Sequence, residues 1–552
     1  MEKVLVTAAL PYINGAPHLG HIVGCHLPAD IFARFQRMRG AKVIFLGGTD
    51  EHGTPIELAA RKVKMDLEKF KSIMREVHRR IYEKFEISYD VFGYTSSEYH
   101  EEFTKNFFLK LYEKGFIFSS KLRMFYCEHD RIFLPGRYVR GTCRYCGYEN
   151  ANGDQCENCG RSMDVDSLID PVCTLCGRRP VVKETKHLFF DLPKIAGEVK
   201  KWLKSVKKRH KPLVVEHALS WVKELKPRCI TRDIKNGVPV PLEGFEGKTL
   251  YVWFDALLGY ISFLGWKFGD KAIDEWWKDK NVRIYHFLGK DNIPFHAVFW
   301  PAMLLAHGEF NLPYQINGLA YLLYEGKKFS KSRGYGVFCE KILESDIDIE
   351  ELRFYLAYLI PENSDTNFSW EDFRSRVNRD LIGNISNFVW RTLHFAKKVE
   401  FPLDGEYERE MEEFMEYARE YVENMEKAEI RKALGDIVLA AGVGNAYLNK
   451  NEPWKIKERE AYRKVVYNAL EMSRMLGIMM YPFTPGFSRR LMETLGLGGE
   501  IRLDDLYRPA TYTVVTMPRE PFFRKIEEGD IGRWKRELTR ASPLEELISR
   551  FS

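Results

Sequence analysis

Two histidines three residues apart are the first side chains in the chain with an obvious chemical use. His18 and His21 end the stretch TAALPYINGAPHLGH, just after a strand-like run, and Pro17 favours a helix that begins beside them. At a helix start, both rings would share one face with unpaired backbone N–H groups. Gly20 would let a planar base approach the backbone. The pattern indicates a site for an anion or a nucleotide. The alternative, which is more common for two histidines of this spacing taken alone, is that one ring caps the helix and the other packs against the core.

A basic loop more than 300 residues further on offers complementary chemistry. The segment GKKFSKSRG runs from Gly326 to Gly334, and its glycines would let the loop move. Lys328, Ser330 and Lys331 could then bring cations and a hydroxyl donor to phosphate oxygens. A solvated basic loop without a ligand is the alternative when this segment is read by itself.

Seven of the ten cysteines lie close together, six of them as Cys-x-x-Cys pairs. In a large chain without a secretory signal, such turns favour tetrahedral zinc over disulfides or redox thiols. We predict one zinc site at Cys143, Cys146, Cys156 and Cys159. We predict a second at Cys127, Cys173 and Cys176, with either His129 or Asp130 as the fourth ligand. Because the segment has little apolar content, the metal would be its core, and chelation should unfold it locally.

The elements that must position these groups begin with a strand, helix, strand unit over residues 3–8, 18–39 and 42–46. Such a unit opens a doubly wound parallel sheet, whose ligands lie beyond the carboxyl ends of the strands. Strand-like runs at 249–254 and 282–289 are expected to resume the sheet. The cysteine-rich region from about 116 to 235, which has little helical periodicity, is expected to be an insertion.

Beyond about residue 375 the pattern becomes helical almost throughout, with runs such as 411–427 and 459–481. The predicted fold is therefore a Rossmann-type doubly wound α/β sheet, split by a zinc-binding connective insertion and followed by an all-α bundle. We expect domain boundaries at 1–115, 116–235, 236–325, 326–375 and 376–552.

Composition and charge exclude little. The net charge of +6 permits a polyanionic partner without requiring one. No apolar run approaches the roughly 18 residues of a membrane span, and the N-terminus lacks a signal-peptide pattern. We therefore expect a cytoplasmic protein that binds neither membrane nor DNA.

Taken together, HLGH and KFSKS resemble the two signature sequences of the class I aminoacyl-tRNA synthetases. Within that class the chain is similar to the methionyl-tRNA synthetase family. The similarity runs from residue 3 to about 525 and rests on these further segments: ALPYING at 9–15, DEHGTP at 50–55, VWFDA at 252–256, GKD at 289–291 and the knuckled insertion.

The resemblance implies that methionine and Mg-ATP form methionyl-adenylate, and that the methionyl group then passes to the terminal ribose of initiator and elongator methionine tRNAs. It implies an ATP site at His18, Gly20, His21, Asp291 and Lys331, with Asp291 on the ribose. Lys328 and Ser330 would assist Lys331 at the departing pyrophosphate. Positioned cations and donors are what in-line attack on a phosphate requires.

For methionine, a flexible thioether favours aromatic walls and a weak donor. By resemblance the pocket is formed by Leu10, Tyr12, Trp253, Ala256, Tyr260 and His296, with Asp50 receiving the ammonium. The chain departs from the bacterial pattern at Leu257, where a proline is expected, and at Asn292, where an aliphatic residue is expected. Ordinary core packing is the alternative for Trp253 and Tyr260.

In the helical region, Asn387 and Arg391 lie one turn apart on a predicted helix and could hydrogen-bond unstacked bases. Pro453 and Trp454 follow at a probable helix start, where the indole could stack on a base. These four residues match anticodon contacts of the family. A surface ion pair for Arg391 and a core position for Trp454 are the alternatives.

Two other functions fit parts of the sequence. Another class I synthetase, such as those for leucine, isoleucine or valine, would carry a large editing insertion, whereas about 120 cysteine-rich residues separate the half-sheets here. A zinc-stapled tRNA-binding protein without enzymatic activity would be expected to lose the His and Lys motifs, and both are intact.

Overall fold

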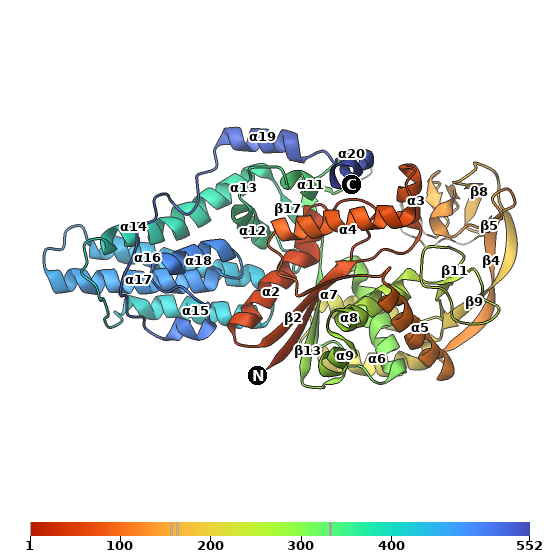
Figure 1. Ribbon diagram of the computed structural model, residues 1–552, viewed down its shortest axis with the longest axis horizontal. Helices are drawn as coiled ribbons and strands as arrows, with labels where there is room; N and C mark the ends of the chain where they lie inside the picture. The colour runs from red at the N-terminus through yellow and green to blue at the C-terminus, as the bar shows by residue number, and fades with distance from the viewer. Residues whose placement is uncertain are drawn as a thin grey trace.

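A five-stranded parallel sheet forms the centre of the molecule (Figure 1). The computed structural model describes residues 2–154, 156, 158–159, 161, 163, 165–330 and 334–552. The strand order is β14-β13-β1-β2-β3, and each neighbouring pair is parallel. The strands are β1 Lys3–Ala8, β2 Lys42–Thr49, β3 Val91–Tyr94, β13 Val282–Gly289 and β14 Gln315–Leu319. Three strands precede the insertion and two follow it, so the predicted split doubly wound sheet is confirmed.

The first crossover is one continuous helical stretch that carries both histidines at its start. It comprises α1 (Leu19–His21), a π-helical turn (Ile22–His26) and α2 (Leu27–Met38). The α2 helix packs against β1, β2 and β13. The sequence prediction of a helix over 18–39 is therefore confirmed to within one residue.

The core contains further helices: α3, α4 and α5 belong to its first half, and α8, α9 and α10 to its second. They are α3 Thr54–Lys62, α4 Leu67–Lys84, α5 Glu98–Glu113, α8 Val252–Phe268, α9 Asp270–Ile273 and α10 Trp300–His307. The strand expected over 249–254 is wrong. Only β12 (Thr249–Leu250) is extended, and it pairs with β11 (Thr231–Arg232) outside the central sheet.

The insertion lies at the end of the molecule opposite the helical bundle (Figure 1). Its long antiparallel pair is β4 (Ile117–Cys127) and β9 (Val181–Phe190), and its cysteine knuckles lie around β6 (Val139–Cys143), β7 (Ala151–Asn152) and β8 (Leu168–Cys173). The expectation that this region lacks helical periodicity is wrong for its second part. There α6 (Leu192–Val206) and α7 (Pro212–Val222) pack against α10 and β14, respectively.

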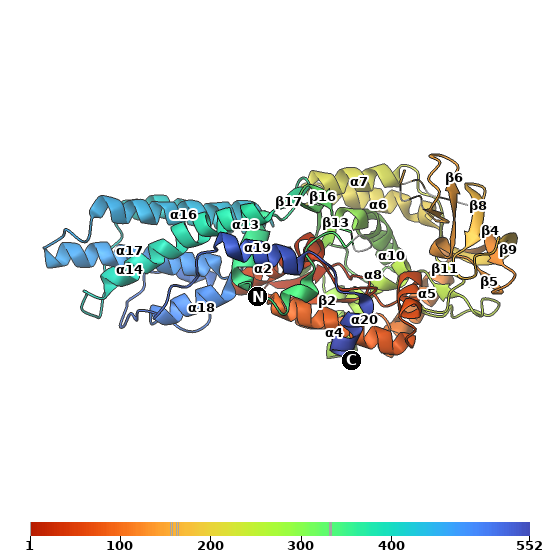
Figure 2. The same ribbon diagram turned by 90° about the horizontal axis from the view of Figure 1, so that it is seen from above.

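The C-terminal lobe is helical, as the sequence predicts. After α11 (Cys339–Ile342) and α12 (Ile349–Tyr358), its helices are α13 Trp370–Arg376, a π-helical stretch Val377–Ser386, α14 Asn387–Ala396, α15 Glu410–Glu426, α16 Ile430–Asn451, α17 Arg459–Met480 and α18 Pro485–Thr494. Two last helices, α19 (Glu528–Leu538) and α20 (Leu544–Phe551), run back to the lobe that holds the central sheet, where α20 contacts α4 (Figure 2). Among the described residues, no helix is both long and apolar enough to span a bilayer.

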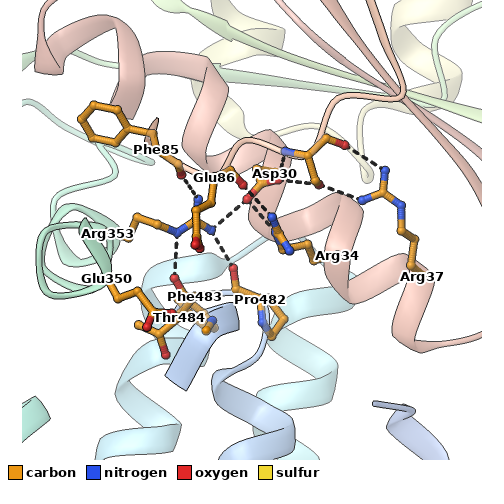
Figure 3. A network of polar contacts seen from close by, with 12 residues as sticks. Asp30, Arg34, Arg37, Phe85, Glu86, Glu350, Arg353, Pro482, Phe483 and Thr484 are labelled. Atoms are coloured by element: carbon orange, nitrogen blue, oxygen red, sulfur yellow. Dashed lines mark hydrogen bonds and ion pairs between the residues drawn. The ribbon is translucent and has the colours of Figure 1, made fainter. Parts of the chain in front are cut away.

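A fully buried arginine joins the two lobes (Figure 3). Arg353 of α12 donates to Asp30 Oδ2 on α2 (2.8 Å), to the Phe85 carbonyl after α4 (2.6 Å), and to the Pro482 and Phe483 carbonyls after α17 (3.1 and 3.0 Å). Burial alone would raise the pKa of Asp30, but Arg34 and Arg353 outweigh it and lower that pKa to about 2. The helix that carries His18 and His21 is thereby fastened to the helical lobe.

Candidate active site

The two histidines form a paired cap at the start of the crossover helix. His18 is the N-cap, and its Nδ1 accepts from the Gly20 N–H at 3.1 Å, while the His18 N–H donates to His21 Nδ1 at 3.1 Å. The ring centroids are 4.0 Å apart, and both side chains are half-buried. The arrangement satisfies two helix-end donors and holds both rings at the carboxyl edge of β1.

A side chain at position 20 would not fit beside this cap. A Cβ built on Gly20 would come within 2.9 Å of the His18 ring. Glycine at this position therefore leaves the His18 ring in place and leaves the backbone open to a planar ligand, as the sequence suggested.

A cavity of about 450 Å³ opens in front of the cap, and it gathers most of the residues predicted to bind ATP. Its lining includes His18, Gly20, His21, Asp291, Lys328 and Leu10. These residues come from the first crossover, the end of β13 and the basic loop, regions up to about 300 positions apart. Their convergence at one edge of a parallel sheet is where the fold class places a ligand.

The basic loop lies directly against the histidines. Phe329 stacks on His18 with ring centroids 4.6 Å apart, and His18 forms a backbone bridge with Phe338. Lys328 lies on the short strand β16 (Lys327–Lys328), and Ser330 exchanges backbone hydrogen bonds with Tyr335 at 2.9 and 3.0 Å. Lys331 lies outside the described residues, so its predicted role stays a prediction.

Asp291 is exposed at the rim of the cavity and accepts a hydrogen bond from the hydroxyl of Tyr321. Burial, followed by this bond and the Asp291 charge, raises the pKa of Tyr321, which stays a phenol. The ammonium groups of Lys290 and Lys328 lie over the Tyr321 ring, 3.8 and 4.8 Å from its centroid. Tyr321 has no role in the sequence prediction, and only its position two residues beyond β14 could have suggested one.

A second cavity, of about 950 Å³, adjoins the first and shares Asp291 and Asn292 with it. Tyr12 and Trp253 line this space, together with Arg228 and Arg232 from the end of the insertion. The two cavities make a groove with phosphate-binding chemistry at one end and aromatic walls at the other.

The residues predicted to contact methionine gather beneath this groove, mostly buried. Tyr260, His296 and Ala256 are 2%, 1% and 6% exposed. The Tyr260 hydroxyl contacts His296 Nε2 at 2.8 Å, and His296 Nδ1 contacts the Asn292 carbonyl at 3.0 Å. Because a carbonyl only accepts, Nδ1 carries the proton and Tyr260 donates to Nε2. Burial lowers the pKa of His296 to about 4, so the ring is neutral at pH 7.

Trp253, which is partly exposed, lines the second cavity. Its indole stacks on Phe295 with centroids 4.0 Å apart and an interplanar angle of 7°. The two departures from the bacterial pattern differ in position: Leu257 is buried in the core, whereas Asn292 lines both cavities and bonds His296 through its backbone. The Asn292 side chain is therefore the one that changes the pocket wall.

Asp50 directly follows the last residue of β2 and is 5% exposed. Beside it lie His52 and Asp255, to which the sequence analysis assigned no role. His52 donates its backbone N–H to Asp50 Oδ1 at 3.2 Å, and its Nδ1 lies 3.1 Å from Asp255 Oδ2. Asp255 lies in the first turn of α8 and is 0% exposed. His52 and Asp255 both fall in segments that carry the family resemblance. In the sequence alone, however, a buried acid such as Asp255 cannot be distinguished from an acid that caps a helix.

The first cysteine cluster fits zinc in both chemistry and size. The sulfur atoms of Cys143, Cys146, Cys156 and Cys159 all lie within 4.8 Å of one another, with Cys143–Cys159 at 3.9 Å and Cys146–Cys156 at 3.6 Å. A tetrahedral ion with Zn–S bonds of about 2.3 Å requires sulfur separations of about 3.8 Å. The predicted ligand set is thus assembled.

The second cluster resolves the choice that the sequence left open. Asp130 Oδ2 lies 3.0 Å from Cys127 Sγ and 3.2 Å from Cys173 Sγ, and Cys176 completes the group. His129 is exposed and lies outside the cluster, with its Nδ1 3.2 Å from Asp130 Oδ1. The geometry therefore favours Asp130 as the fourth ligand, with His129 oriented towards its second oxygen.

These knuckles also have a small apolar core of their own. It consists of buried residues of the insertion: Phe125, Leu134, Tyr138, Val139, Ala151, Met163 and Leu168. The expectation that metal alone would form the core of this segment is therefore too strong.

At the far end of the helical lobe, three of the four predicted anticodon residues reach the surface. Asn387 is exposed at the start of α14, and Arg391 donates to Asn445 Oδ1 (3.3 Å) and Asn449 Oδ1 (2.8 Å) on α16. Trp454 is 50% exposed, whereas Pro453 is buried. Trp454 lies in the turn after α16 and not at a helix start, because α17 begins only at Arg459.

Comparison with known proteins places each lobe in a family. The model for tRNA synthetases class I (M) matches residues 4–393, and the model for the anticodon binding domain of methionyl tRNA ligase matches residues 402–542. Methionine–tRNA ligase of Ignicoccus hospitalis is 43% identical over 91% of both chains. That of Aeropyrum pernix is 42% identical over 97% of this chain and 96% of its own.

A solved structure extends the likeness to three dimensions. Mycobacterium tuberculosis methionyl-tRNA synthetase in complex with methionyl-adenylate superposes with a TM-score of 0.78 at 25% identity. The match covers 94% of this chain and 99% of the mycobacterial chain.

Proposed function

Since the chain belongs to the methionine–tRNA ligases of the class I tRNA synthetases, we propose that it activates methionine with Mg-ATP and transfers the methionyl group to methionine tRNA in the cytoplasm. The observation that carries this proposal is the single cavity in which His18, His21, Asp291 and Lys328 converge from distant parts of the chain. Neither a binding protein nor a structural module requires those four groups around one space.

In the activation step, the methionine carboxylate attacks the α-phosphate of ATP and pyrophosphate leaves. His18 and His21 lie where their rings and the helix-end N–H groups can hold the triphosphate. Lys328, and Lys331 on the same loop, neutralise the charge that develops on the leaving pyrophosphate, with Ser330 as a donor. Asp291 holds the ribose hydroxyls at the cavity rim.

The methionine side chain lies between Leu10, Tyr12, Trp253, Ala256 and Tyr260, with His296 oriented by Tyr260 and Asn292. A neutral, buried His296 suits a thioether, because neither partner carries a charge that would have to be desolvated. Asp50 receives the ammonium group.

The transfer step needs the tRNA to reach both ends of the molecule. Asn387, Arg391 and Trp454 lie at one end and contact the anticodon, with Pro453 shaping the turn that presents Trp454. The groove beside Arg228 and Arg232 admits the 3′ end. Two zinc ions, one in each cysteine cluster, would fix the knuckles of the insertion and take no part in the chemistry.

ATP–pyrophosphate exchange with single amino acids tests the activation step. Exchange should depend on methionine and be far slower with leucine, isoleucine, valine or cysteine. Exchange that is absent with methionine, or equally fast with isoleucine, would refute the proposal.

A further inference from the structure

In the part of the chain that the structure describes, two buried carboxyl groups close to the groove residues Tyr12 and Trp253 have no lysine or arginine partner. Asp50 and Asp255 are 5% and 0% exposed, and both contact His52. Within the described part of the chain, no lysine or arginine nitrogen lies within 4.0 Å of either carboxylate. Burial lowers the pKa of His52 to about 4, so this ring supplies a hydrogen bond but no charge at pH 7.

One oxygen of Asp255 is left without a hydrogen bond. Its Oδ2 faces His52 Nδ1, while its Oδ1 is buried and unpartnered. An ionised carboxylate in that situation is strongly unfavourable unless a cation or a proton joins it. Burial raises the pKa of both acids, and for Asp50 the neighbouring Asp255 raises it further.

The surrounding charged groups cannot fill this role because they have other partners. Glu51 binds Arg75 through two bonds of 2.7 Å, and Lys71 pairs with Glu68 at 2.8 Å. Tyr12 adds a phenol whose pKa is raised by burial and then by Asp50.

The remaining charged groups around His52 and Tyr12 are Glu101 on α5 and Arg137 in the insertion, and His100 on α5 is the nearest other imidazole. Burial lowers the pKa of His100 well below its usual value, so that ring is also neutral. The two acids are thus buried with no ammonium or guanidinium group of the described chain within ion-pair distance, so a bound cation would complete the cluster.

The position of the pair indicates which cation that is. Asp255 shares the first turn of α8 with Trp253 and Ala256, two walls of the proposed methionine pocket, and Asp50 bridges to Tyr12 in the backbone. A substrate whose side chain lies against these walls would bring its α-ammonium group to the two acids.

We propose that Asp255 acts with Asp50 as a paired binding site for the α-ammonium of methionine, and that the free protein holds one proton shared between the two carboxyl groups. When the ammonium group binds, both acids become carboxylates and the shared proton leaves to the solvent. No bond in the substrate is made or broken. The inference rests on the proposed function, because it names how that substrate is recognised.

The number of protons released on methionine binding tests this directly. It is obtained by titration calorimetry at pH 7 in two buffers whose ionisation enthalpies differ. The wild-type protein should release close to one proton. Asp255→Asn should release clearly fewer protons, because the repulsion from Asp255 that adds to burial in raising the pKa of Asp50 is lost, and should bind methionine about tenfold or more weakly. Asp274→Asn, the same change at an exposed carboxylate, should behave as the wild type.

Two analogues separate recognition from folding. Methioninol keeps the ammonium group and should release the proton, whereas 4-(methylthio)butanoate lacks it and should release none in any variant. If Asp255→Asn does not fold, Asp50→Asn should show the same loss of proton release. Methionine binding without proton release in the wild type, or equal release in Asp255→Asn, would overturn the inference while leaving the proposed function standing. Absence of any methionine binding would instead refute the function.

Discussion

Replacing Arg353 with methionine should loosen the joint between the two lobes more than any surface substitution can. The change removes four hydrogen bonds, one of which is the ion pair with Asp30, from a site with no exposed area, and methionine keeps most of the volume. Breaking a buried pair by removing one partner typically destabilises by about 3–5 kcal/mol. Asp30 keeps Arg34 and Ser88 as partners, so we expect about 3–4 kcal/mol.

The pKa of Asp30 supports this scale. A fall from 3.8 to about 2 corresponds to roughly 2.5 kcal/mol for the groups that favour its charged form. Because the folded-state pKa is lowered, this stabilisation is present above pH 3.8 and is lost as the pH falls towards 2.

The assay is equilibrium unfolding in urea, followed by tryptophan fluorescence and by far-UV circular dichroism, with each transition fitted separately because a chain of this size unfolds lobe by lobe. Arg376→Met is the matched control, since it removes an arginine whose pair with Asp372 is partly exposed, with side chains 37% and 38% exposed, and should cost less than about 1 kcal/mol. The double variant Asp30→Asn with Arg353→Met should lose less than the sum of the two single variants. Equal losses in Arg353→Met and Arg376→Met would refute the reasoning.

Three further predictions concern the proposed sites. Lys331→Ala should depress methionine-dependent pyrophosphate exchange by about a hundredfold or more with little change in methionine affinity, because its charge acts only as pyrophosphate departs. Equal losses in the exchange rate and in methionine affinity would place Lys331 in ground-state binding. Trp454→Ala should leave exchange unchanged and weaken tRNA charging by about tenfold, the scale of one stacked base. Unchanged charging would remove Trp454 from the anticodon contact. Trp266→Ala, at another exposed indole, is the control. Metal analysis should give two zinc ions per chain, and one in the double variant Asp130→Ala, Cys127→Ala. A count of one zinc in the wild type would refute the second site.

From the sequence alone, three of the five strands of the central sheet and most of the helical lobe are predicted correctly, whereas β3 and β14 are not predicted. Residues 3–8, 42–46 and 282–289 are short apolar runs bounded by polar residues, and each forms a strand of the sheet. The run from Thr249 to Phe254 has the same composition but begins a buried helix, since periodicity cannot separate a buried strand from a buried helix. In α6 the apolar residues do have helical spacing, which the nearby cysteine pattern obscured.

The histidine pair and the cysteine clusters could be predicted because their spacing along the chain is itself the signal. Asp255 and Tyr321 could not be predicted in the same way, because their partners are distant in sequence and only the folded chain brings them together. The proposed fourth ligand of the second cluster also depended on the fold, which turns Asp130 towards the sulfurs and leaves His129 outside.

Charging of methionine tRNA is the measurement that tests the central claim most directly. The purified protein, given ATP, radiolabelled methionine and tRNA, should attach methionine to the 3′ end of methionine tRNA, and changing the anticodon of that tRNA should reduce the rate at least tenfold. Omission of ATP should abolish the product. Methionine-dependent exchange without any charging, or charging that is indifferent to the anticodon, would contradict the account.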